Sequence, residues 1–135
     1  RGVGHLLRRA APWVPLATGI DHAACTRDEA LWPGRAADPL RHDRISAPLF
    51  FGMLDGGASL SGRAAAVATP TLLLLGGADP LIDPRASRAF FDGLGAADRT
   101  LREYPESRHE PLNDLGRDRV IADIRDWLAA RLGPD

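Results

Sequence analysis

The residues of this sequence that could do proton-transfer chemistry are a carboxylate and an imidazole. Asp79 follows the apolar run Leu72–Leu75 and the pair Gly76-Gly77, and His109 follows Tyr104-Pro105 thirty positions later. In a Ser-Asp-His triad, an aspartate orients a histidine that takes the proton of the serine nucleophile. No Gly-x-Ser-x-Gly string occurs. We therefore expect the last two members of a triad, with the nucleophile on residues outside this chain.

The segments around these two residues predict the order strand, helix, strand, helix. Thr71–Leu75 is a short apolar run bounded by proline and glycine, which is typical of a buried strand in a parallel sheet. Asp83-Pro84 predicts the start of a helix that Gly95 would end. Thr100–Tyr104 predicts a second strand, and the apolar spacing within residues 120–132 predicts a final amphipathic helix.

This order would bring the carboxylate and the imidazole together. A helical crossover makes the two strands parallel, so their carboxyl ends open on the same edge of the sheet. Neighbouring strands lie roughly 4.8 Å apart, so loops at their ends can place Asp79 and His109 in hydrogen-bond contact. The alternatives are a turn aspartate and a surface-loop histidine. Asp83 is the better helix cap, which leaves Asp79 without that structural role.

The first half of the sequence is less regular. Residues 1 to about 44 predict short helices joined by turns. Residues 45–67 predict one or two helices with a break at Gly56-Gly57. The other histidines and the cysteine have no metal-ligand spacing and are expected on the surface or in packing: His5, His22, His42 and Cys25.

Composition excludes several classes of function. The 135 residues are 44% hydrophobic and 26% charged with a net charge of −1, the balance of one soluble globular domain without a basic face for nucleic acid. All 17 basic residues are arginine, which excludes a Schiff-base lysine and a P-loop lysine. No apolar stretch approaches ~20 residues, so no transmembrane segment is expected. The single cysteine suits a reducing compartment, and we expect a cytoplasmic protein, free or peripheral to a membrane. Because the chain begins at Arg1, we expect a fragment or a processed product.

From about Leu16 onward, the chain resembles the carboxyl-terminal part of α/β-hydrolases of the monoacylglycerol lipase and lysophospholipase group, which are classed with serine aminopeptidase-like hydrolases. In that group, a strand ending Leu-Leu-x-Gly-x-Ala-Asp presents the catalytic aspartate, which corresponds to Asp79. A strand ending near Tyr-Pro, followed by His-Glu, presents the catalytic histidine, which corresponds to His109.

The resemblance implies a partial α/β-hydrolase fold with a mainly parallel sheet. Residues 1–68 would form the cap and the helix that returns to the core, and residues 69–135 the last β-α-β-α part of the core. The resemblance also implies that apolar side chains line the acyl channel: Phe50, Met53, Leu54, Leu81 and Ile82.

The chain departs from the group at three places. The nearest string to the nucleophile motif, Gly57–Gly62, has serine where the second glycine belongs and no apolar strand before it. Arg35 stands where a cap tyrosine is often found, and Arg108 stands where an aromatic residue often precedes the histidine. These two changes affect the expected contacts to a polar head group and leave the triad roles unchanged.

We therefore expect part of a serine hydrolase that cleaves carboxylic esters of lipid-like substrates by acyl transfer, without a metal or organic cofactor. Its expected partner is the missing amino-terminal half of the same fold. One alternative is a non-catalytic truncated binding module. The other is a related hydrolase that acts on peptides, epoxides, carbon-halogen or carbon-carbon bonds. Alone, the chain should associate or dissolve poorly, because the strand Thr71–Leu75 requires neighbours on both edges.

Overall fold

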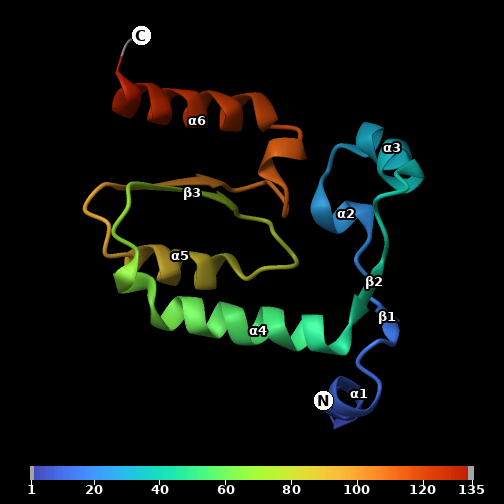
Figure 1. The fold of residues 1–135 in the computed structure, drawn as a ribbon. Helices are drawn as coiled ribbons and strands as arrows, with labels where there is room; N and C mark the ends of the chain where they lie inside the picture. The colour runs from blue at the N-terminus through green and yellow to red at the C-terminus, as the bar shows by residue number, and fades with distance from the viewer. Residues whose placement is uncertain (1, 134–135) are drawn as a thin grey trace.

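The computed structural model describes residues 2–133 as a series of short elements followed by a regular β-α-β-α unit (Figure 1). The helices are α1 (Gly2–Ala10), α2 (His22–Cys25), α3 (Trp32–Ala37), α4 (Ala47–Gly62), α5 (Pro84–Asp92) and α6 (Arg117–Leu132). The strands are β1 (Pro15–Ala17), β2 (Arg44–Ser46), β3 (Thr71–Gly76) and β4 (Arg99–Tyr104). Short 3-10 turns cover residues 29–31, 64–66 and 111–113.

The strands β3 and β4 pair in parallel. Their register runs from Thr71 opposite Arg99 to Gly76 opposite Tyr104. Helix α5 is the crossover between them, and Figure 1 shows α5 and α6 on opposite sides of the strand pair. The predicted order of strand, helix, strand and helix is confirmed. Both strands therefore end at the same edge of the sheet.

Helix α6 is fixed onto β4 by buried and half-buried side chains. The Tyr104 hydroxyl donates to Asp123 Oδ2 at 2.8 Å, and the Trp127 indole donates to Thr100 Oγ1 at 3.1 Å. Burial, together with the bond to Asp123, raises the pKa of Tyr104 to about 12. Val120 on α6 is fully buried. These contacts hold the end of β4, from which the His109 loop departs.

Helix α5 begins as the sequence predicts and ends earlier. The Asp83 side chain caps it by accepting from the Arg85 N–H at 2.9 Å, and Pro84 occupies the first turn. The helix ends at Asp92 with Gly93 as its C-cap, so the predicted end at Gly95 is wrong. A Cβ on Gly95 would lie 2.1 Å from the Ala65 carbonyl oxygen. Gly95 therefore serves a close approach of two backbones rather than the helix end.

Helix α4 is continuous through Gly56-Gly57, where the sequence predicted a break. The Ser46 side chain accepts from the Leu49 N–H at 3.4 Å and starts the helix, which then runs without interruption to Gly62. Glycine lowers helix stability by roughly 1 kcal/mol relative to alanine, but it does not prevent helical hydrogen bonds as proline does. The predicted break is therefore wrong.

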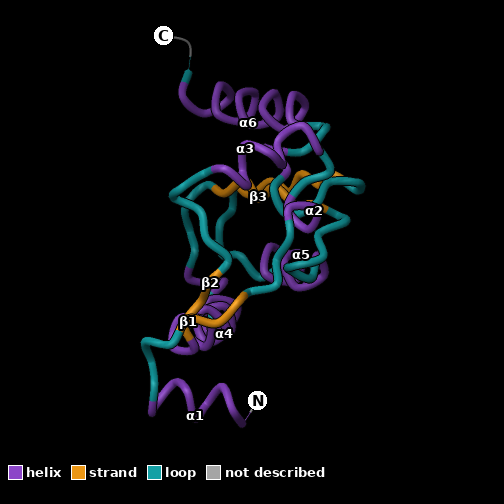
Figure 2. The backbone as a smooth tube through the Cα atoms, turned by 90° about the vertical axis from the view of Figure 1, so that its right-hand side faces the viewer, coloured by secondary structure: helices purple, strands orange, loops and turns teal. Residues whose placement is uncertain are grey.

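The first half contains a strand pair that the sequence analysis missed. Residues of β1 and β2 pair antiparallel, with Leu16 opposite Ile45, and Figure 2 shows this pair beside α4. The expected short helices are present as α1, α2 and α3. Strands of three residues carry too little alternation to be recognised, and their pairing joins segments far apart in sequence.

Burial is uneven along the chain. Leu75 and Tyr104 are buried at the carboxyl ends of β3 and β4, whereas residues 71–74 of β3 are only half-buried. Within residues 2–133, the sheet that contains β3 has two strands, so each strand keeps one unpaired edge. The strand predicted as buried on both faces is thus only partly covered here. No helix in this described part is long and apolar enough to cross a membrane.

Candidate active site

The turn after β3 holds Asp79 in a defined position. One carboxylate oxygen, Oδ1, accepts the backbone N–H groups of Leu81 at 2.7 Å and Ile82 at 3.1 Å. The Asp79 side chain is only 8% exposed. Asp79 therefore does have a structural role in this turn, which the sequence analysis did not expect. Its second carboxylate oxygen, Oδ2, remains available for another hydrogen bond.

The loop after β4 carries His109 and is anchored by a buried carboxylate. Asp114 is fully buried and accepts the backbone N–H groups of Arg108 at 2.8 Å, Leu115 at 2.8 Å and Arg27 at 3.0 Å. Burial raises the pKa of Asp114, but these donors and the Arg27 guanidinium outweigh burial, and the pKa lies below its ordinary value. The residue preceding His109 is thus tied to an ionised carboxylate inside the protein.

The two loops are joined to each other by their backbones. Gly77 donates to the Tyr104 carbonyl at 2.9 Å, and Ala78 donates to the Ser107 carbonyl at 3.0 Å. A Cβ on Gly76 would lie 2.1 Å from the Arg108 carbonyl oxygen. Glycine at this position permits the close approach that sets the two loops side by side.

This arrangement brings Asp79 and His109 into contact. The His109 Nδ1–H group donates to Asp79 Oδ2 at 2.9 Å. An ionised aspartate only accepts hydrogen bonds, so Nδ1 carries the proton and Nε2 is left as the basic nitrogen. The His109 side chain is 38% exposed, which leaves it open to a reacting group. A carboxylate that orients an accessible imidazole can support proton transfer to or from a nucleophile.

Residues of the first half form one wall of this site. Arg35 on α3 makes a bidentate ion pair with Glu110, with Nη1 to Oε2 and Nη2 to Oε1 both at 2.6 Å. The hydrogen bonds from Arg35 lower the pKa of Glu110 to about 2. The Glu110 N–H donates to the carbonyl of Cys25 at 2.9 Å. The residue after His109 is therefore attached to both α2 and α3.

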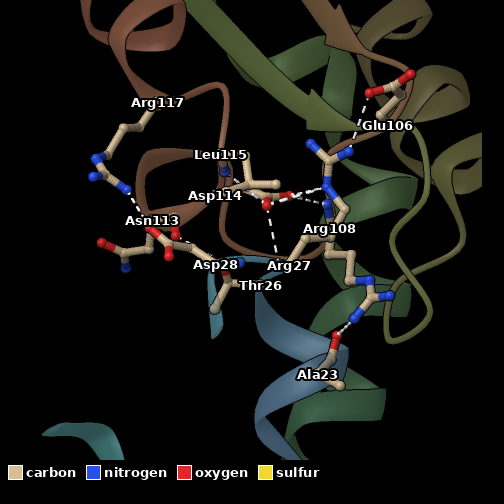
Figure 3. A network of polar contacts seen from close by, with 10 residues as sticks. All are labelled: Ala23, Thr26, Arg27, Asp28, Glu106, Arg108, Asn113, Asp114, Leu115 and Arg117. Carbon is tan, nitrogen blue, oxygen red and sulfur yellow. Dashed lines mark hydrogen bonds and ion pairs between the residues drawn. The ribbon is translucent and has the colours of Figure 1, made fainter. Parts of the chain in front are cut away.

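A second set of polar contacts ties residues 23–28 to the His109 loop (Figure 3). The Arg27 side chain binds Asp114 through Nε at 3.2 Å and Glu106 through Nη1 at 3.1 Å. The Thr26 hydroxyl donates to the Asn113 carbonyl at 2.7 Å, and the Arg108 guanidinium donates to the Ala23 carbonyl. The loop that carries His109 is thus held between the core and the first half of the chain.

A cavity of about 530 Å³ opens beside His109. Its lining includes Leu81 and Glu110 together with side chains that the sequence analysis left to the surface or to packing: His22, Cys25 and His42. Burial, followed by the charge of Glu110, raises the pKa of the Cys25 thiol. No signal in the sequence placed these residues at the site, because they follow no motif and reach it only through tertiary packing.

The predicted acyl-channel residues do not gather in this cavity. Leu81 lines it, whereas the others lie outside its lining and are at least 46% exposed: Phe50, Met53, Leu54 and Ile82. Phe50 packs edge-on against Phe51, whose ring stacks on His5 of α1. Their assignment to an acyl channel stays a prediction.

The serines of the nearest nucleophile-like string lie on α4. Ser59 is exposed, and the Ser61 hydroxyl donates to the Gly57 carbonyl at 3.0 Å within the helix. In the part of the chain that the structure describes, Asp79 is the side-chain hydrogen-bond partner of His109, and no serine hydroxyl bonds to this ring.

Comparison with known proteins identifies relatives along most of the chain. The family model described as serine aminopeptidase, S33, matches residues 1–116. The chain is 30% identical over 131 residues to a monoacylglycerol lipase of Mycolicibacterium smegmatis, covering 96% of this chain and 46% of that protein. It is 27% identical over 142 residues to a monoglyceride lipase of Saccharomyces cerevisiae, covering 93% of this chain and 44% of that protein. It also superimposes on the crystal structure of Paleococcus ferrophilus monoacylglycerol lipase with a TM-score of 0.87 and 30% identity, covering 96% of this chain and 51% of that one. The chain thus spans about half the length of these relatives.

Proposed function

Because the chain belongs to the serine aminopeptidase, S33, family and has part of the α/β-hydrolase fold of its monoacylglycerol lipase-like group, we propose that it supplies the acid and the base of a Ser-Asp-His triad in a serine ester hydrolase. The observation that carries this proposal is the 2.9 Å hydrogen bond from His109 Nδ1 to Asp79 Oδ2 at the ends of two parallel strands. Parallel sheets present their ligand sites at this edge.

The mechanism follows from the protonation of the ring. With Nδ1–H directed at Asp79, the Nε2 atom of His109 accepts the proton of a serine hydroxyl as that oxygen attacks the ester carbon. The ring returns the proton to the leaving alcohol. A water then hydrolyses the acyl-serine, with His109 again as the base. Asp79 holds the tautomer and stabilises the imidazolium.

The proposal includes a nucleophile and oxyanion donors from the missing amino-terminal half of the fold. The absence of Gly-x-Ser-x-Gly among the 135 residues and the half-length match to the relatives support it. Residues 1–68 would serve as the cap and residues 69–135 as part of the core. We place the protein in the cytoplasm, free or peripheral to a membrane.

Lipid-like esters are the proposed substrates. The relatives from Mycolicibacterium smegmatis and Saccharomyces cerevisiae are a monoacylglycerol lipase and a monoglyceride lipase, which supports a glycerol ester with one acyl chain. The exposed apolar side chains Phe50, Met53, Leu54 and Ile82, together with Leu81, would line the acyl channel once the missing half covers them.

Peptides are the second candidate substrate class. The description of the matching family as a serine aminopeptidase favours them. The same acid and base would serve both reactions, because an ester and an amide each pass through a tetrahedral intermediate. The two candidates therefore differ in the leaving group, which is measurable.

A chimera tests the proposed function. The part of the Paleococcus ferrophilus lipase that this chain does not match would be joined ahead of residue 1, and hydrolysis of a monoacylglycerol and of an aminoacyl amide would be compared. We expect ester hydrolysis that His109→Gln abolishes and that His5→Gln, on α1, leaves intact. A folded but inactive chimera would favour the non-catalytic binding module. A preference for the amide would favour the peptidase.

A fluorophosphonate probe tests the origin of the nucleophile, since it reacts only with an activated serine. Intact-mass analysis of the 135-residue chain should show no adduct, whereas the chimera should carry one adduct on the lipase part. An adduct on any serine of this chain would contradict the proposal, the candidates being Ser46, Ser59, Ser61, Ser87 and Ser107.

A further inference from the structure

The cavity beside His109 has a wall rich in ionisable side chains. It is formed by residues of the first half and by the His109 loop, including Arg35, Arg41, His22, His42, Asp43 and Glu110. An acyl chain placed there would remove water from these groups without offering them hydrogen bonds, which is unfavourable. The cavity therefore suits a polar part of a substrate.

One arginine on this wall has no carboxylate partner among residues 2–133. Glu110 is neutralised by Arg35, and Asp43 lies 3.4 Å from the guanidinium of Arg44. Within residues 2–133, Arg41 makes no ion pair with a carboxylate. Its Nη1 atom donates to His22 Nδ1 at 2.6 Å, and a ring nitrogen that accepts a hydrogen bond belongs to a neutral imidazole. The half-buried Arg41 thus keeps guanidinium N–H groups on the cavity wall that no carboxylate of the described residues binds.

The neighbouring histidines, His22 and His42, supply further hydrogen-bond donors beside Arg41. His22 Nδ1 accepts from Arg41, and His42 Nδ1 accepts the Arg44 N–H at 3.2 Å. A neutral imidazole that accepts at Nδ1 carries its proton on Nε2. Both rings therefore have an Nε2–H donor beside an arginine, and this is the combination that binds phosphate or carboxylate oxygens.

We infer that this cavity binds the alcohol part of the ester and that Arg41 selects alcohols bearing an anionic group, such as a phosphate. The inference rests on the proposed function, because His109 in the same cavity wall sets where the ester bond lies. Arg41 is then a specificity-determining residue.

Binding to the chimera tests this inference without hydrolysis, because none of the probes contains a carboxylic ester. Dissociation constants of sn-glycerol 3-phosphate, glycerol and inorganic phosphate would be measured by NMR from the ring signals of His22, His42 and His109. We expect glycerol 3-phosphate to bind at least tenfold more tightly than either glycerol or inorganic phosphate. Arg41→Gln should weaken its binding by about tenfold or more, the usual size for a charge-assisted hydrogen bond.

Two variants control the measurement. Arg63→Gln removes one positive charge at the exposed end of α4 and should leave binding unchanged. Arg41→Glu should reverse the preference, so that the amino alcohol serinol binds more tightly than glycerol 3-phosphate. This reversal is a gain of binding that an unfolded variant could not give.

Three outcomes would overturn the inference. The first is equal binding of glycerol and glycerol 3-phosphate, and the second is no effect of Arg41→Gln. The third is equal binding of inorganic phosphate and glycerol 3-phosphate, which would assign the cavity to a free anion instead of a leaving alcohol. If the chimera still hydrolyses esters, any of these outcomes would overturn only the role of Arg41 and would leave the proposed function standing.

Discussion

Asp79 uses its two carboxylate oxygens for different tasks. Oδ1 accepts two backbone N–H groups of its own turn, and Oδ2 accepts the imidazole of His109. The turn fixes the carboxylate before any substrate arrives, so the ring can be held in one orientation without reorganisation. In the proposed triad, Asp79 acts on the reaction only through this orientation and through the charge of the imidazolium.

The exchange Asp79→Asn tests this division of tasks. The amide keeps an acceptor for the turn but can present its NH2 group to the ring, which favours the wrong tautomer. In the chimera, we expect kcat to fall by about 10⁴-fold with little change in KM, as in serine-protease triads. Asp55→Asn on the exposed face of α4 is the control and should keep full activity. A change of less than tenfold at Asp79 would remove it from the triad.

Glu110 makes a separate, pH-dependent contribution. Arg35 lowers the folded-state pKa of Glu110 to about 2, below its unfolded value near 4.5. The ion pair therefore makes its full contribution to the stability of the folded state above about pH 4.5. This contribution is lost as the pH falls from about 4.5 toward 2. It is on the order of 3 kcal/mol, because the pKa of Glu110 falls from 4.5 to about 2.

Chemical unfolding of the chimera at pH 6 and at pH 2.5, with and without substitutions in this chain, checks this contribution. The free energy of unfolding of the unsubstituted chain should fall more between these pH values than that of Glu110→Gln, which lacks the titrating group. Glu29→Gln on an exposed turn should follow the unsubstituted chain. Parallel curves for Glu110→Gln and the unsubstituted chain would contradict a strong Arg35–Glu110 pair.

Glycines have opposite roles in different elements of this fold. Gly56 and Gly57 lie inside α4 with no atom within 4 Å of an added Cβ. We therefore expect Gly56→Ala and Gly57→Ala each to raise the free energy of unfolding by about 0.5–1 kcal/mol, since alanine reduces the freedom of the unfolded chain. Urea unfolding of the chimera measures this difference. No gain at either position would indicate that α4 is interrupted there in solution.

The same exchange at the end of β3 should have the reverse effect. An added Cβ on Gly76 would meet the Arg108 carbonyl at 2.1 Å, so the loop that carries His109 must move. Gly76→Ala should lower stability and should weaken the NMR signal of the Nδ1–H proton shared by His109 and Asp79. Gly57→Ala is the matched control. An unchanged proton signal in Gly76→Ala would show that the two loops tolerate separation.

The described part of the chain leaves a large apolar surface in water. Exposed apolar side chains lie on α4 and on α6, among them Leu49, Phe50, Met53, Leu54, Ile121, Leu128 and Leu132. The parallel pair β3–β4 also keeps unpaired strand edges. Apolar patches and open edges of this kind favour association with another surface.

We therefore expect the 135-residue chain to self-associate in isolation. Size-exclusion chromatography with light scattering should show species larger than the 14.5 kDa monomer. The chimera with the lipase part should be monomeric, because the added half covers the strand edge and the apolar faces. A stable 14.5 kDa monomer with a cooperative melting transition would contradict this expectation.

The order β3-α5-β4-α6 and the positions of Asp79 and His109 could be predicted from the sequence, because their signals are local. Each signal involves only a few neighbouring positions. The signals are an apolar run between proline and glycine, an aspartate cap before Pro84, and polar residues just after two strands. The tertiary structure decided the other features. These are the pairing of β1 with β2, the continuity of α4, the Arg35–Glu110 ion pair, and the cavity wall with His22, Cys25 and His42. These features join residues far apart along the chain, and packing alone determines which of many such contacts form.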